Sequence, residues 1–134
     1  MLAIDYGAKR TGIAITDPLG MIASPHDVVK THHLNTYLEN YFKKEEVEQV
    51  IIGLPKKENG EKTNATSLVR DYIRSFKNKF PSLPIIEHDE RYTSKLALDA
   101  MITGGTKKSY RQDKGNIDKI SAAIILQSYL ERIS

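Results

Sequence analysis

The chain has 134 residues, 40% hydrophobic and 28% charged, with 20 Lys and Arg against 17 Asp and Glu. This composition is that of a globular chain, the length predicts a single domain over residues 1–134, and the lack of cysteine excludes disulfides, thiolate catalysis and Cys-ligated metal centres. Because no apolar run approaches the roughly 20 residues that span a bilayer, and the start lacks a signal peptide's pattern, we expect a cytoplasmic protein without a membrane partner.

The first 24 residues predict three short antiparallel strands. Two apolar runs, residues 1–6 and 12–16, flank the turn-prone segment 7–10 and are typical of a β-hairpin. A third strand over residues 21–24 is expected to end at Pro25, because proline cannot donate a hydrogen bond to a sheet.

Helical and strand patterns then alternate. Apolar residues at helical spacing, or short β-branched runs, predict a helix from Leu34, a strand over 50–52, a helix over 65–80, a strand from Ile85, a short helix over 94–101 and a last helix over 117–133. The order βββαβαβα predicts an α/β fold, with a five-stranded mixed sheet and helices on both faces.

Three acidic residues stand where a carboxylate needs a compensating partner. Asp5 is in an interior strand, Glu90 ends another, and Asp118 is expected in the first turn of the last helix. Each has a structural alternative. Asp5 can cap the turn at Gly7, and Glu90 can pair with Arg91. Asp118 can stabilise the start of the last helix through the helix dipole. The expected topology brings the three together, where they would repel unless a cation neutralised them. We therefore predict a site for Mg²⁺ or Mn²⁺, and two such ions suit phosphodiester hydrolysis.

The surplus positive charge is concentrated between residues 106 and 116. This segment holds four basic residues against Asp113 alone, an excess equal to the net charge of +3. Such a loop either grips phosphates or is a solvated, flexible connection. Basic residues also stand in the first hairpin and after Glu90. We expect nucleic acid to be held by Lys9, Arg10, Arg91, Lys107, Lys108, Arg111 and Lys114.

Several other kinds of site are missing from the sequence. It has no G-x-S-x-G elbow, no H-E-x-x-H motif and no P-loop, which argues against α/β-hydrolases, zincins and P-loop NTPases. The four histidines lack a metal-binding spacing, so surface or hydrogen-bonded roles are expected for His26, His32, His33 and His88.

Five short motifs together resemble the YqgF/RuvX family over essentially the full chain. They are Asp5-Tyr6-Gly7, the segment Lys9-Arg10-Thr11-Gly12-Ile13-Ala14, Gly53-Leu54-Pro55, Asp89-Glu90-Arg91, and Ile117-Asp118 with Ala122-Ala123 and Ile125-Leu126. The resemblance implies a ribonuclease H-like nuclease domain. It also implies an activity described either as Holliday junction resolution or as maturation of the 5′ end of the 16S ribosomal RNA precursor.

By the same resemblance, Asp5, Glu90 and Asp118 would be the metal-binding catalytic acids. The chain departs from the family pattern at Thr11, where a hydrophobic residue is common, in the loop 58–60, and at Tyr92. None of these departures removes an expected metal ligand.

These observations favour a metal-dependent endonuclease acting on structured or precursor RNA, with branched DNA as the second candidate substrate. One alternative is a nucleotide-handling module similar to half of actin or of a sugar kinase, which share the Asp-x-Gly hairpin. Another is a non-catalytic RNA-binding protein of ribosome assembly. Cutting two strands of a junction would call for a homodimer, whereas trimming one RNA strand needs only a monomer.

Overall fold

The computed structural model describes residues 1–20, 22–55, 64–90 and 114–133, with only the backbone described for 90, 114 and 115. The strands are β1 (Leu2–Asp5), β2 (Arg10–Thr16), β3 (Ala23–Lys30), β4 (Val50–Pro55) and β5 (Ile85–Glu90). The helices are the 3₁₀ turn η1 (Thr31–His33), α1 (Leu34–Lys44), α2 (Asn64–Lys79) and α5 (Lys114–Ile133). The short helix expected over 94–101 lies outside the described residues.

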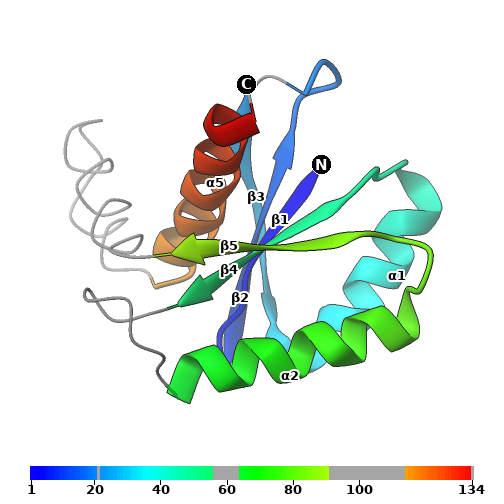
Figure 1. The fold of residues 1–134 in the computed structure, drawn as a ribbon, viewed down its shortest axis with the longest axis vertical. Helices are drawn as coiled ribbons and strands as arrows, with labels where there is room; N and C mark the ends of the chain where they lie inside the picture. The colour runs from blue at the N-terminus through cyan, green and yellow to red at the C-terminus, as the bar shows by residue number, and fades with distance from the viewer. Residues whose placement is uncertain (21, 56–63, 91–113, 134) are drawn as a thin grey trace.

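The strands form one mixed sheet in the order β3-β2-β1-β4-β5. β1 and β2 are antiparallel, as are β2 and β3, whereas β1, β4 and β5 run parallel. Figure 1 shows α5 on one side of this sheet and α1 and α2 on the other. The expected five-stranded mixed sheet with helices on both faces is confirmed, and it places Asp5 at the end of the central strand.

The third strand differs from its prediction, because β3 continues through Pro25 to Lys30. The register pairs Ala14 with Pro25 but Ile13 with Asp27, so the residue between them bulges out of the pairing. β3 is an edge strand, and an edge tolerates proline where its missing N–H would face solvent. The expectation that Pro25 ends the strand was wrong because it did not allow for this position at the edge.

The last helix also begins earlier than expected, at Lys114 rather than at residue 117. Asp118 therefore lies beyond the first turn, which carries no acidic residue. Because the helix dipole acts within the first turn, stabilisation of the helix end does not explain Asp118.

The two faces of the sheet carry separate cores of different bulk. Large side chains, among them Leu2 and Ile4 of β1 and Phe76 of α2, fill the space between the sheet and α1 and α2. The α5 face instead carries small residues such as Ala3 and Ala14, which pack against Ala122. Small side chains on both surfaces allow α5 to lie close to the sheet.

At Gly12 of β2, the backbone of α5 lies directly against the sheet. A Cβ atom at this position would overlap the backbone carbonyl of Asp118 and would lie 2.9 Å from the amide nitrogen of Lys119. Since these neighbours are backbone atoms, they cannot move aside as a flexible side chain could. A residue without a side chain is therefore needed where α5 crosses β2.

We predict that Gly12→Ala lowers the free energy of unfolding by about 3 kcal/mol or more, at the upper end of the usual cost of overpacking. Urea denaturation of the purified proteins measures this difference. Gly20→Asn is the control, because Gly20 has a positive φ of 69° that asparagine tolerates and no atom within 4 Å of its Cβ position. Equal stability of Gly12→Ala and wild type would contradict the close packing.

His88 is a buried histidine of β5 that packs beneath α5. Its Nε2 atom lies 3.0 Å from Oγ of Ser128, and its ring meets that of Tyr129 edge-on. Burial lowers the pKa of His88, the charge of Arg132 lowers it further, and Asp89 partly opposes the shift. The other three histidines are exposed, as expected, whereas in His88 only Nε2 is hydrogen-bonded and buried Nδ1 has no partner among the described residues.

We expect the free energy of unfolding to fall as the pH is lowered from about 7 to 5. Unfolded His88 takes up a proton near the ordinary histidine pKa of about 6.5, whereas folded His88 resists protonation until a lower pH. The unfolded state binds more protons in this window, so acid favours unfolding. Urea denaturation across this range should give a shallower pH dependence for His88→Gln than for wild type or the exposed-site control His26→Gln. Identical slopes for all three would contradict the prediction.

Candidate functional site

Asp5 and Asp118 are brought together around Gly12. Asp5 ends β1 and pairs in register with Gly12 of β2, and Gly12 lies against the backbone of Asp118. Both acids are half-buried. Two of the three acids expected from the sequence, 113 positions apart in the numbering, therefore lie at the same end of the sheet, on the face covered by α5.

Glu90, the third expected acid, is the last residue of β5 and pairs with Pro55 of β4. Because β1, β4 and β5 are parallel, their carboxyl ends share one edge, where ligands gather in α/β sheets. Strand alternation assigns Asp5 to the face of Ala3, which packs toward α5. The side chain of Glu90 is outside the described part, so its convergence on the other two acids stays a prediction.

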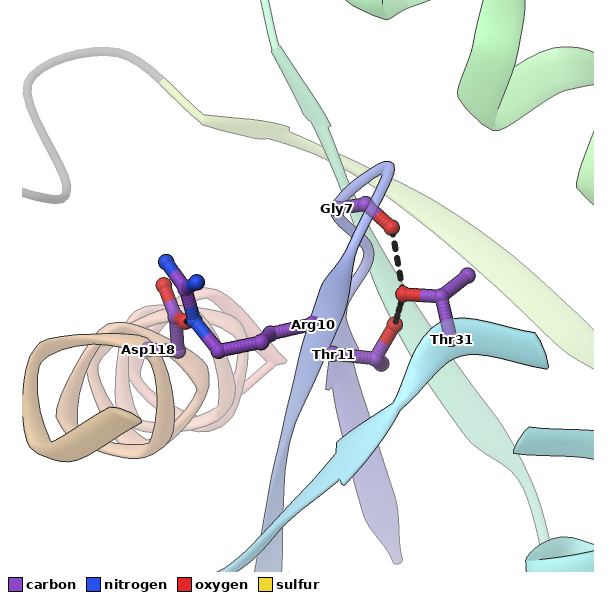
Figure 2. A network of polar contacts seen from close by, with 5 residues as sticks. All are labelled: Gly7, Arg10, Thr11, Thr31 and Asp118. Carbon is purple, nitrogen blue, oxygen red and sulfur yellow. Dashed lines mark hydrogen bonds and ion pairs between the residues drawn. The ribbon is translucent and has the colours of Figure 1, made fainter. Parts of the chain in front are cut away.

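Asp118 forms an ion pair with Arg10 at the start of β2. Nε of Arg10 donates to Oδ2 of Asp118 at 3.0 Å, across 108 positions of sequence (Figure 2). The two side chains are 40% and 25% exposed, so the pair contributes less than about 1 kcal/mol to stability. Arg10, expected only as a phosphate contact, also balances the charge of a candidate metal ligand.

A second polar network holds the turn between β1 and β2. The hydroxyl of Thr31 donates to the carbonyl of Gly7 at 2.6 Å, and it lies 2.9 Å from the hydroxyl of buried Thr11 (Figure 2). The amide of Thr31 donates to the carbonyl of Lys9 at 3.0 Å. These bonds tie the turn that carries Lys9 and Arg10 to the end of β3.

The network explains one departure from the family pattern. Thr11 is fully buried where a hydrophobic residue is common, and its hydroxyl finds its partner in Thr31. Thr31 was missed by sequence analysis, although a threonine within an otherwise apolar strand signals that a buried hydrogen-bond partner is needed.

The remaining cations expected at the site are only partly described. Lys9 is exposed at the β1–β2 turn. Lys114 is the first residue of α5, with its backbone alone described. Outside the described residues lie Arg91, Lys107, Lys108 and Arg111.

Carboxylate oxygens are the ligands that Mg²⁺ and Mn²⁺ prefer, so Asp5 and Asp118 fit such an ion chemically. Among the side chains that the structure describes, no three of the acidic, histidine or cysteine type lie close enough to hold a metal together. A three-acid centre would therefore require Glu90 or residues of the segment 91–113.

No helix in the described part of the chain is long and apolar enough to cross a membrane.

The sequence matches known proteins over nearly its full length. The family model described as "RuvX: Holliday junction resolvase" matches residues 1–132. A protein of Flavobacterium psychrophilum named "Putative pre-16S rRNA nuclease" is 49% identical over 132 residues, covering 98% of this chain and 96% of the relative. A protein of the same name from Bacteroides thetaiotaomicron is 49% identical over 131 residues, covering 98% and 95%.

Two solved structures share the fold. The fowlpox virus resolvase in complex with its substrate Holliday junction DNA aligns with a TM-score of 0.60 at 15% identity, covering 99% of each chain. The fowlpox virus Holliday junction resolvase alone aligns with a TM-score of 0.53 at 17% identity, covering 100% of each chain. The expectation of a ribonuclease H-like fold is confirmed.

We predict that Thr31→Val lowers the free energy of unfolding by about 1–3 kcal/mol, because it leaves the buried hydroxyl of Thr11 without its partner. The double variant Thr11→Val/Thr31→Val should recover part of this loss, since it no longer buries an unpaired hydroxyl. Urea denaturation of both single variants and the double variant completes a double-mutant cycle. Strictly additive losses would show that the two hydroxyls do not interact.

Proposed function

Because this chain belongs to the RuvX family, we propose that it is a metal-dependent endonuclease that hydrolyses phosphodiester bonds in precursor or structured RNA. The observation that carries the proposal is the meeting of Asp5 and Asp118 around Gly12, at the carboxyl edge of the parallel strands. Two carboxylates at this edge suit a cation, which can in turn bind a phosphate. Arg10 adds a positive charge beside them.

The 5′ end of the 16S ribosomal RNA precursor is the substrate that the relatives favour. Proteins about half identical to this chain over almost all of it are named for that precursor. Branched DNA is the second candidate, favoured by the family's description as a Holliday junction resolvase. A role in maturing ribosomal RNA would place the protein in the cytoplasm, and trimming one strand would require only a monomer.

In this proposal Asp5, Glu90 and Asp118 would hold two Mg²⁺ or Mn²⁺ ions. Such ions supply an activated water and stabilise the charge on the leaving oxygen of an in-line displacement. Arg10 orients Asp118 through the bond to Oδ2, and its guanidinium is exposed enough to contact an incoming phosphate. Lys9 and the cations of the segment 107–114 would hold the sugar–phosphate backbone on either side.

The bonds from Thr31 give this arrangement its rigidity. Because the turn of residues 7–10 is tied to the end of β3, Arg10 enters β2 at a set position relative to Asp5. Preorganised groups avoid the cost of reorganising when the substrate binds.

We expect Asp5→Asn to slow metal-dependent cleavage of a 16S precursor fragment by at least about 100-fold, because it removes a charged ligand from the centre. Single-turnover assays with Mg²⁺ or Mn²⁺ measure the rate. Glu39→Gln removes one negative charge from an exposed position of α1 and should leave the rate within about twofold. Full metal-dependent activity of Asp5→Asn would refute the assignment.

The same assay separates the proposal from its alternatives when EDTA is included and a four-way DNA junction is tested in parallel. Cleavage of the RNA that EDTA abolishes supports the proposed function, whereas cleavage of the junction alone favours a resolvase. RNA binding without cleavage, insensitive to EDTA, indicates a non-catalytic assembly protein. ATP binding measured by calorimetry would favour the nucleotide-handling module.

A further inference from the structure

A recess of about 370 Å³ opens on the α2 side of the sheet, beside the carboxyl end of β1. Tyr6 follows β1 directly, His32 comes from η1, Asn35 from α1, and Asp71 and Tyr72 from α2. The volume is within the range of small-molecule sites. Neither the proposed catalysis nor the comparisons use this recess.

Aromatic and apolar surfaces form much of the recess. The rings of Tyr6 and Tyr72 are stacked, with centroids 4.5 Å apart and planes inclined by 21°. His32 is exposed at the rim, and Leu68, which is 39% exposed, adds an apolar wall. Because the ring of Tyr6 covers that of buried Tyr72, half-buried Tyr6 and exposed His32 are the flat groups that can stack on a nucleobase, with little dependence on sequence.

Polar groups in the recess supply both a donor and an acceptor for the edge of a base. The hydroxyl of Tyr72 donates to Oδ1 of Asn35 at 2.9 Å, so the amide nitrogen of Asn35 remains as the donor of that side chain. Burial raises the pKa of the Tyr72 phenol, which keeps this donor protonated. Oδ1 of Asp71 is ion-paired with exposed Arg74 on the same helix, and the carboxylate can also accept from the amino group of a base.

The recess and the candidate cleavage site adjoin the same strand end. Asp5 and Tyr6 are successive residues; Asp5 is assigned to the α5 face, and Tyr6 packs with the core on the α2 side. Thr31 lines the recess and also binds the turn that carries Lys9 and Arg10. A strand crossing this edge could therefore reach both places, with exposed Lys9 and Lys30 beside its path.

We propose that this recess receives an unpaired base of the strand whose phosphate is cleaved at Asp5 and Asp118. The inference rests on the proposed function and adds a substrate class to it. A base held in a duplex cannot be splayed onto an aromatic wall, so the recess selects substrates that are single-stranded next to the cut.

The test uses single-stranded RNA from the precursor's 5′ region, with 2-aminopurine at one position at a time and EDTA present to prevent cleavage. Stacking quenches this fluorophore, so wild type should quench it at one or two defined positions. His32→Ala should relieve the quenching there and weaken RNA binding by about 5- to 100-fold. His26→Ala replaces an exposed histidine outside the recess and should behave as wild type.

A second variant tests whether the loss of quenching and of RNA binding comes from the recess and not from a loss of folding. Ser75→Leu narrows the recess from the exposed surface of α2 with an aliphatic side chain that offers no aromatic face, and it should relieve the quenching at the same positions. Both variants should keep the wild-type circular dichroism spectrum. With Mg²⁺, both should raise KM for the single-stranded substrate while kcat stays within about threefold, because the recess does not touch the reacting atoms.

The outcomes separate this inference from the proposed function. RNA cleavage by wild type, with quenching and affinity unchanged in both variants, overturns the inference and leaves the nuclease intact. Position-specific quenching that both variants abolish supports base binding. If that quenching occurs but no substrate is cleaved, base binding stands and the nuclease fails. Uniform quenching along the RNA overturns the inference, because it shows no defined base site.

Discussion

The close approach of α5 to Gly12 is the constraint on which the rest of the structure depends. Since no side chain separates the helix from β2 at this point, the backbone of Asp118 reaches the strand that pairs with Asp5. The same approach puts Asp118 within hydrogen-bond distance of Arg10. Small residues elsewhere on the interface, such as Ala3 and Ala122, allow the rest of α5 to pack close to the sheet as well. The packing of α5 on the sheet therefore also positions the residues of the candidate site.

Successive side chains of β1 and β2 point to opposite faces of the sheet, so two kinds of group are separated at this edge. Asp5 and Arg10 belong to the α5 side, where the charged groups of the proposed chemistry gather. Their neighbours Tyr6 and Thr11 turn to the other side, where one lines a recess and the other anchors a turn. One residue step thus separates groups suited to a phosphate from groups suited to a base. In this way the ends of two short strands can contact both the sugar–phosphate backbone and a base of the same nucleic-acid strand.

Periodicity in the sequence was enough to predict the sheet, because strand and helix patterns alternate clearly and Asp5 is an anomaly in an apolar strand. It could not predict that β3 passes Pro25, since that depends on the strand lying at an edge. The Arg10–Asp118 pair joins residues 108 positions apart, so no local pattern reveals it. Gly12 was recognised as part of a motif, but its structural role, which is to leave room for the backbone of α5, depends on a helix far away in the sequence. The predicted convergence of Glu90 depends on a side chain outside the described residues.

The irregular course of β3 has a consequence for self-association. An exposed edge strand is a template onto which another chain can add its own strand, and uncontrolled addition leads to aggregation. Pro25 has no N–H to donate to an added strand. The bulge beside it interrupts the regular spacing of hydrogen-bonding groups that an added strand would need. This border of the sheet is thereby protected. If two molecules do join, their contact is expected elsewhere than along a continuous sheet built across β3.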